Sequence, residues 1–186
     1  MIGLGKGRTI RSGRLAVIAA LLIAAIPCRA DGPTREYLIK AAFVYNFTQF
    51  VEWPDSAFPS RDAAFVVATV GPDPFNGALE SAMSGKTAAD RNVQVVHYDT
   101  LSDVGQCQVL FVPAALDPSL KSLFDTLGNR PVLTVGETDA FDPAGGCMRF
   151  FLEDNRMRFE VSPDAISAAG LKVSAKLMKL ARIYKK

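Results

Sequence analysis

CQVLFVPAALDPSLKSLFDTLGNRPVLTVG, residues 107–136, decides the fold class of this chain. The segment contains two apolar runs, 107–112 and 131–135, which are typical of fully buried strands. Between them, Asp117-Pro118 provides a capping residue and a proline at the first helical position, and Gly128 ends the predicted helix. A strand, a helix and a second strand in this order predict parallel strands joined by a crossover helix.

The same alternation extends in both directions. Residues 65–70 and 92–98 predict two more strands, with a short helix between them, and residues 147–161 predict an antiparallel hairpin turning at Asp154-Asn155. Short helices are expected after residue 162 and over 174–183. We therefore predict an α/β fold: a single three-layer domain, a mostly parallel sheet with helices on both faces, and a C-terminal antiparallel hairpin followed by helices.

The hairpin register follows from which side chains it places opposite each other. One face carries three apolar pairs, Met148–Val161, Phe150–Phe159 and Leu152–Met157. The other face carries the pairs Arg149–Glu160, Phe151–Arg158 and Glu153–Arg156. Apolar pairs on one face and complementary charges on the other favour this register. The charged face is either a solvated face with cross-strand pairs or a partner surface, with Arg149, Arg158 and Glu160 as candidate contacts.

A helix predicted over residues 35–51 is apolar around an unusually large part of its circumference. Thr34 caps its start, and Trp53-Pro54 ends it because the residue before a proline is pushed toward extended geometry. Its apolar residues exceed what one helix face can bury against one sheet. Either all of them are core, or some also form a dimer or partner interface. The candidates for partner binding are Phe43, Tyr45, Phe47, Phe50 and Trp53.

The first 30 residues have the layout of a secretory signal peptide. Four basic residues (Lys6, Arg8, Arg11 and Arg14) precede an apolar run of twelve residues, 15–26, and small residues precede a cleavage site after Ala30. An uncleaved membrane anchor is the alternative, but twelve residues are short for a span. A lipoprotein starting at Cys28 is a second alternative, which Pro27 disfavours. We predict a signal peptide at 1–30 and one domain at 31–186.

Removing the predicted signal peptide changes the charge and leaves two cysteines. The full chain has a net charge of +2; residues 1–30 contain five of its 21 Lys and Arg, so the remainder has 16 against 19 Asp and Glu, a net of −3. Without a clustered basic stripe we expect no nucleic-acid partner. Cys107 and Cys147 are expected on neighbouring strands, and an oxidising compartment permits a disulfide between them without a count of two establishing it.

The sequence contains no recognisable catalytic signature. His97 is the only histidine, G-x-S-x-G is absent, and Gly85-Lys86-Thr87 is not a phosphate-binding loop because position 80 is Glu80. We therefore predict no enzyme activity, no cofactor and no metal site. The loop 136–146 follows a predicted strand and holds Glu137, Asp139 and Asp142. It is either a solvated acidic loop or a site for a cation or for acid–base chemistry, which would make the protein a small-ligand binder or an enzyme.

Four groups of segments together resemble the YfiR-like family of periplasmic proteins. They are EYLIKAAFVYNF (36–47) with FVEWP (50–54); VLTVGE (132–137) with Phe141 and Gly145-Gly146; FLEDNR (151–156) with RFEV (158–161); and AGLKVSAKLMKLA (169–181). The resemblance implies a periplasmic regulatory binding protein of cyclic-di-GMP signalling and biofilm formation. Such a protein restrains an inner-membrane diguanylate cyclase through that enzyme's periplasmic region. It further implies a homodimer and an outer-membrane lipoprotein that sequesters the regulator. With only Cys107 and Cys147, the chain cannot form the family's full disulfide set.

Overall fold

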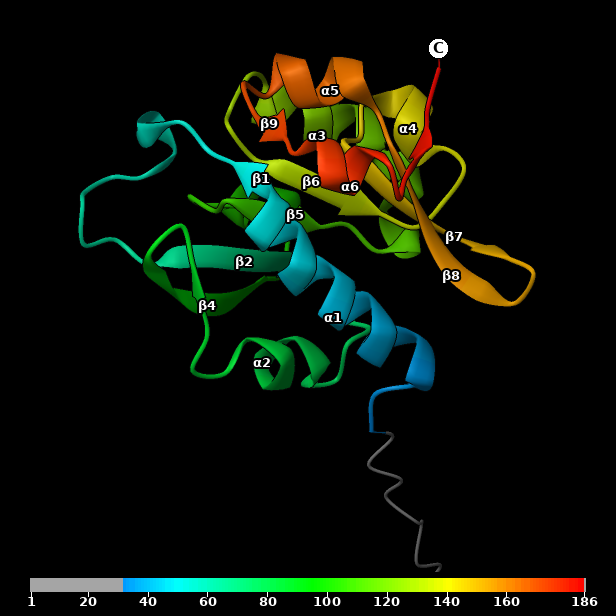
Figure 1. Cartoon of the computed structure of the whole chain (residues 1–186), viewed down its shortest axis with the longest axis horizontal. Helices are drawn as coiled ribbons and strands as arrows, with labels where there is room; N and C mark the ends of the chain where they lie inside the picture. The colour runs from blue at the N-terminus through cyan, green and yellow to red at the C-terminus, as the bar shows by residue number, and fades with distance from the viewer. Residues whose placement is uncertain (1–31, 186) are drawn as a thin grey trace, which may run out of the picture. The chain divides into compact units, whose positions relative to one another are not determined.

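A computed structural model of the chain describes residues 32–185, so the predicted signal peptide at 1–30 lies outside the described residues. Among residues 32–185 no helix is both long enough and apolar enough to cross a membrane. The larger sheet has the strand order β10-β8-β7-β6-β5-β2-β4-β3, and β1 pairs with β9 separately (Figure 1). The strands are β1 (Val51–Glu52), β2 (Phe65–Val70), β3 (Thr87–Ala88), β4 (Arg91–Tyr98), β5 (Val109–Phe111), β6 (Leu133–Gly136), β7 (Met148–Glu153), β8 (Arg156–Val161), β9 (Lys172–Val173) and β10 (Arg182–Ile183).

Helices cover both faces of this sheet. The α-helices are α1 (Arg35–Phe50), α2 (Ala78–Met83), α3 (Leu120–Leu127), α4 (Phe141–Ala144), α5 (Pro163–Ala168) and α6 (Ala175–Met178); 3₁₀ turns are η1 (Asp55–Ala57), η2 (Leu101–Asp103) and η3 (Ala114–Ser119). The strands β4, β2, β5, β6 and β7 run parallel, whereas β8 is antiparallel to β7. This confirms the predicted α/β fold with a mostly parallel sheet.

The core consists of two hydrophobic clusters, one on each face of the sheet. Side chains of β2 alternate between them: Phe65 and Val67 join the cluster with α1 and α2, and Ala68 and Val70 join the cluster with α3 and α4. A central strand with both faces covered reads as a continuous apolar run, which is what residues 65–70 show. The three-layer architecture is therefore built from strands that are buried on both sides.

The hairpin β7–β8 has the predicted register in all six residue pairs, from Met148–Val161 to Glu153–Arg156. Asp154 and Asn155 both have positive φ, at 49° and 58°. Two left-handed central residues characterise the type I′ turn, whose twist matches that of the flanking strands. The turn chemistry and the alternation of side chains therefore agree on one pairing.

The helix predicted over 174–183 is wrong beyond its first turn. Residues 175–178 form α6, and Arg182–Ile183 form β10, which runs parallel to β8. Leu177 is the buried apolar residue of α6, while Leu180 is 65% exposed, so a longer helix has little apolar surface to bury. The chain instead covers the outer edge of β8, where the Tyr184 N–H donates to the carbonyl oxygen of Val161 at 2.8 Å.

Two glycines hold the ring of Phe141 at the start of α4. A Cβ added at Gly136 would lie 2.3 Å from this ring, and one added at Gly146 would lie 2.1 Å from it. Phe141 is 1% exposed and cannot swing away into solvent. The backbone at the end of β6 and just before β7 lies very close to the Phe141 ring. Both positions therefore require glycine, which has no side chain.

We predict that Gly146→Ala lowers the free energy of unfolding by about 1–3 kcal/mol, the usual cost of overpacking a filled core. Urea denaturation of the chain starting at residue 31 measures the change. Gly32→Ala, with nothing within 4 Å of the new Cβ, is the matched control and should leave the midpoint unchanged. A Gly146→Ala midpoint equal to that of Gly32→Ala would contradict this account of the Phe141 site.

Candidate functional site

Four phenylalanine rings join α1 to the hairpin. The Phe47 ring centroid lies 5.7 Å from that of Phe150 and 5.0 Å from that of Phe159. Phe43 lies 5.9 Å and 5.8 Å from the same two rings. Phe47 is fully buried, whereas Phe43 is partly exposed. Of these two candidates for partner binding, only Phe43 has side-chain surface available outside the core.

The other three aromatic candidates are partly buried, and each contacts its own chain. The ammonium group of Lys86 lies 4.1 Å from the Tyr45 ring centroid, and that of Lys176 lies 5.1 Å from that of Phe50. The Trp53 indole N–H donates to the carbonyl oxygen of Gln108 at 3.0 Å. Trp53 therefore anchors the end of α1 to the sheet as well as carrying some exposed surface.

An apolar groove runs between the N-terminal half of α1 and the outer part of the hairpin. It has a volume of about 470 Å³. Four apolar side chains line it, Ile39, Phe43, Leu152 and Met157, and the rim carries Arg35, Glu36, Asn155 and Arg156. We call this feature the α1–hairpin groove. It combines apolar walls with a rim of both charge signs, as partner-binding surfaces commonly do.

Exposed apolar side chains gather around this groove. Leu152 is 60% exposed and Ile39 is 38% exposed; Leu38, on the same helix but outside the groove lining, is 49% exposed. The fourth large exposed apolar residue among those described, Leu180, follows α6 and is absent from the groove lining. Large apolar side chains gathered in one exposed place usually mark an interaction surface.

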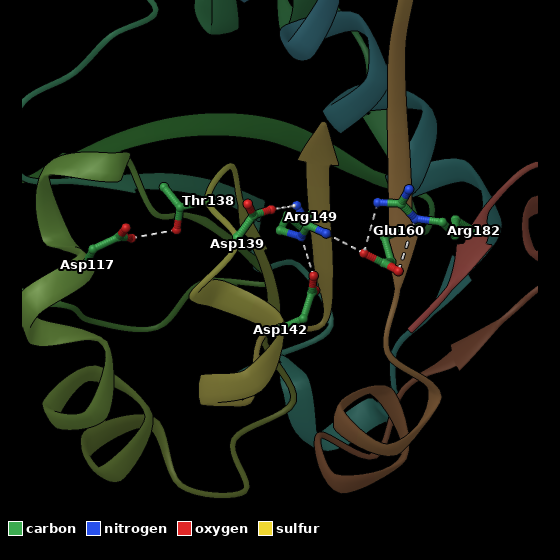
Figure 2. A network of polar contacts seen from close by, with 7 residues as sticks. All are labelled: Asp117, Thr138, Asp139, Asp142, Arg149, Glu160 and Arg182. Atoms are coloured by element: carbon green, nitrogen blue, oxygen red, sulfur yellow. Dashed lines mark hydrogen bonds and ion pairs between the residues drawn. The ribbon is translucent and has the colours of Figure 1, made fainter. Parts of the chain in front are cut away.

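Arg149 forms an ion network on the opposite face of the hairpin, with Asp142 and Glu160 buried and Asp139 exposed (Figure 2). Its guanidinium donates to Asp142, to Asp139 at 2.6 Å and to Glu160 at 2.5 Å. Arg182 of β10 pairs with Glu160 at 3.2 Å. Arg149 and Glu160, two of the candidate partner contacts, are 8% and 6% exposed, so the charged face is not solvated at these two positions. The loop containing α4 and the added strand β10 cover them.

Arg158, the third charged candidate, lies differently. It is about half-exposed and its Nε lies 3.7 Å from Glu153 Oε2. Phe151 lies opposite Arg158 in the register, as predicted. Its ring, however, is covered by the Arg182 guanidinium, which lies 3.6 Å from the ring centroid. The predicted charged face is thus solvated near the hairpin tip and buried near its base.

The acidic residues of loop 136–146 do not converge on one site. Glu137 accepts hydrogen bonds from Lys40 at 2.6 Å, from Tyr37 at 3.1 Å and from the Ala114 N–H at 3.0 Å. Asp139 and Asp142 instead bind Arg149. Among residues 32–185 no group of three His, Cys, Asp or Glu side chains is placed to hold a metal ion. Each carboxylate already has a cationic partner, which disfavours the loop as an acid–base site.

The polar contacts of α1 with loop 136–146 went unpredicted. Lys40 is 3% exposed and also pairs with Glu36 at 2.5 Å. Burial, followed by the charge of Glu137, raises the pKa of the Tyr37 hydroxyl. The signal in the sequence was Lys40 itself, which shares a helical face with the buried Val44 and Phe47. A lysine on a buried face requires a buried partner.

His97, the only histidine, has two partners. One ring nitrogen contacts Thr69 Oγ1 at 2.6 Å and the other contacts Glu80 Oε1 at 2.5 Å. These contacts connect β4 to β2 and to α2. We assign the side chain a structural role.

The predicted proximity of Cys107 and Cys147 is wrong. Cys107 precedes β5 and Cys147 precedes β7, with β6 between these strands, and both cysteines are free and buried. Strands two positions apart are separated by about 9–10 Å, beyond the roughly 7 Å limit between the Cα atoms of a disulfide. The two side chains also belong to different hydrophobic clusters. A bond between them is excluded by the topology.

We predict two titratable thiols per chain when the unreduced protein starting at residue 31 is denatured and reacted with a thiol reagent. In the native protein both thiols should react slowly, because both are buried and burial raises the pKa of Cys107 to about 11. A count of zero thiols under denaturing conditions would show a Cys107–Cys147 bond and contradict the strand order.

The hairpin offers a matched pair of arginines for a stability test. Arg149→Ala leaves the buried Asp142 and Glu160 with one cation fewer, so we expect a loss of about 3–5 kcal/mol in the free energy of unfolding. Arg158→Ala removes a half-exposed arginine and should cost about 1 kcal/mol or less. Urea denaturation of both variants measures the difference. Equal losses would show that the Arg149 network is not an internal support of the fold.

Comparisons with known proteins give partial structural matches and one family match. The ABC domain in complex with L-Trp from Streptococcus pneumonia has a TM-score of 0.48 at 7% identity, covering 64% of this chain and 55% of that chain. A conserved domain protein from Vibrio cholerae has a TM-score of 0.48 at 8% identity, covering 64% and 54%. The chain thus spans about half the length of both. The family described as YfiR/HmsC-like matches residues 37–182, most of the described structure. The chain belongs to the YfiR/HmsC-like family.

Proposed function

We propose that this protein is a periplasmic regulatory binding protein that restrains an inner-membrane signalling enzyme, such as a diguanylate cyclase, by binding its periplasmic region. Family membership over residues 37–182 supports the regulatory role. The observation that carries the proposal is the α1–hairpin groove, where apolar side chains remain exposed next to a well-packed core.

The groove suits a partner that inserts an apolar side chain between α1 and the hairpin. Ile39 and Phe43 form one wall, and Leu152 and Met157 form the other. Apolar anchors that fill a pocket dominate the binding energy of many interfaces, while surrounding polar contacts contribute less. Arg35 and Arg156 on the rim, beside Glu36, can pair with charges around such an anchor. Partner binding would then depend on apolar residues and only weakly on the rim charges.

One wall of the groove is held in place by the core. Phe43 lines the groove and at the same time packs against Phe150 and Phe159 in the core. A side chain shared by the core and the surface holds the surface in one shape, which lowers the entropic cost of binding. An outer-membrane lipoprotein that competes for this surface would release the enzyme.

The proposal predicts the behaviour of three matched substitutions in the native host. Deleting the gene should raise cyclic-di-GMP, and the wild-type chain should restore the low level. Leu152→Asp and Ile39→Asp should fail to restore it, because a charge in the groove opposes an apolar anchor. Leu180→Asp changes an equally exposed leucine outside the groove and should restore it fully.

Melting curves provide the control for folding, since exposed substitutions usually change stability by no more than about 0.5 kcal/mol. An unchanged cyclic-di-GMP level on deletion would rule out restraint of a diguanylate cyclase. Full restoration by both groove variants would place the partner surface elsewhere.

A further inference from the structure

The C-terminal part of the chain carries an unbalanced charge. Residues 165–186 contain six Lys and Arg and no Asp or Glu, whereas residues 31–164 contain ten Lys and Arg against 19 Asp and Glu, a net of −9. The positive residues belong to a stretch that contains β9, α6 and β10 and lies outside the lining of the α1–hairpin groove. We call residues 171–185 the basic segment.

Backbone hydrogen bonds and apolar packing hold the basic segment in place (red in Figure 1). At one end β9 pairs with β1, and the Ser174 N–H donates to the carbonyl oxygen of Phe50 at 2.8 Å. At the other end β10 pairs with β8. The side chains that pack into the same hydrophobic cluster as α1 are Leu171, Val173, Leu177, Met178 and Ala181. The segment is therefore a fixed part of the fold with an inner apolar side.

The exposed side of the basic segment is rich in lysine. Its four exposed lysines are Lys172, Lys176, Lys179 and Lys185. None of the ion pairs found among residues 32–185 includes any of them. The Lys176 ammonium lies 5.1 Å from the Phe50 ring centroid, a contact that leaves its charge uncompensated. Four positive charges thus face solvent without an anionic partner in the described chain.

Carboxylates reduce this charge only at the margins of the segment. Glu52 lies opposite Lys172 in the β1–β9 pair. Glu160 adjoins β10 but is already bound by Arg149 and Arg182. At 0.1 M salt the Debye length is about 10 Å, so acidic groups farther away act weakly on an anion that touches the lysines. An anionic surface would therefore be attracted to the basic segment and repelled by the rest of the chain.

An apolar groove opens beside Lys172. It has a volume of about 410 Å³ and lies between α5 and the basic segment. Its apolar lining consists of Val161, Pro163, Ile166, Leu171, Val173 and Met178. Lys172 is the one charged residue in the lining, and no acidic residue lines the groove. Apolar surface beside lysines is typical of protein surfaces that bind the interface of an anionic bilayer.

The kind of cation also favours a bilayer over an acidic protein segment. Arginine binds fixed carboxylates through its rigid fork, whereas lysine is a point charge on a flexible stem. The arginine of the basic segment, Arg182, is occupied by Glu160 and by the ring of Phe151. The available cations are all lysines, spread over β9, α6 and the residues beyond β10. Such an arrangement suits a broad, fluid surface of negative charge.

We propose that the basic segment binds the surface of anionic phospholipid bilayers, with its lysine ammonium groups on the lipid head groups and the apolar groove turned toward the acyl region. The proposal does not depend on the α1–hairpin groove or on the partner that binds there. Such binding would hold the chain at a membrane surface without a spanning helix or a covalent anchor.

The test is cosedimentation with sucrose-loaded vesicles of phosphatidylcholine alone or with 30% phosphatidylglycerol. The chain starting at residue 31 is used, because the apolar run 15–26 would bind lipid by itself. An exposed Lys or Arg contributes about fivefold to binding at an anionic membrane surface. For four lysines we expect a Kd of about 1 mM in accessible lipid at 0.1 M salt. Binding should be at least about tenfold weaker to the neutral vesicles and in 0.5 M salt.

Two double variants with the same change in net charge locate the surface. Lys172→Gln with Lys179→Gln removes two charges of the basic segment and should weaken binding to the anionic vesicles about 25-fold. Lys86→Gln with Lys121→Gln changes two exposed lysines outside the segment and should change binding by less than about twofold. All four positions are exposed, so melting curves of both variants should match that of the unmodified chain.

Four results would overturn the proposal. One is no sedimentation with the anionic vesicles at 10 mM accessible lipid. Another is equal binding to neutral and anionic vesicles, which would show that the lysines do not direct it. The third is an equal loss in both double variants, which would show an effect of net charge alone. The fourth is binding of soluble poly-L-glutamate as tight as that of the vesicles, which would assign the lysines to an acidic protein segment instead.

Discussion

The packing of Phe47 between the rings of Phe150 and Phe159 is the contact on which the rest of the structure depends. It fixes α1 across the face of the sheet at the base of the hairpin, with Phe43 beside it. Because the hairpin extends beyond this contact, its tip and the N-terminal half of α1 remain apart (Figure 1). The α1–hairpin groove is the consequence: beyond the ring cluster that completes the core, Ile39 and Leu152 remain partly exposed.

On the other face of the hairpin, the Arg149 network fixes the positions of the neighbouring segments. It ties loop 136–146 to the hairpin, and through Glu160 and Arg182 it ties the hairpin to β10 (Figure 2). Buried ion pairs rarely add much net stability, but removing one partner is expensive. The network therefore specifies where α4 and β10 sit more than it strengthens the fold. Phe141, held between Gly136 and Gly146, fixes the same loop by packing.

Much of the fold could be predicted because its sequence signals are local. The apolar runs, the proline and glycine positions and the pairing across Asp154-Asn155 each need only nearby residues, and the hairpin register was right in every pair. Contacts between distant segments could not be derived. Nothing local indicated that Arg182 would cover β8, that Lys40 would meet Glu137, or that β6 would separate the two cysteines. Aromatic spacing on α1 indicated a helix with surplus apolar surface, but only the packing distinguishes the buried Phe47 from the shared Phe43.

We propose that the α1–hairpin groove is the surface through which this protein binds a partner. Hydrogen–deuterium exchange, measured for the chain alone and with the purified periplasmic region of the inner-membrane enzyme that we propose as its partner, tests this most directly. The account predicts added protection confined to residues 35–43 and 152–157, with little change across β2, β4 and α3. Protection concentrated on those elements, with the groove exchanging as in the free protein, would contradict it.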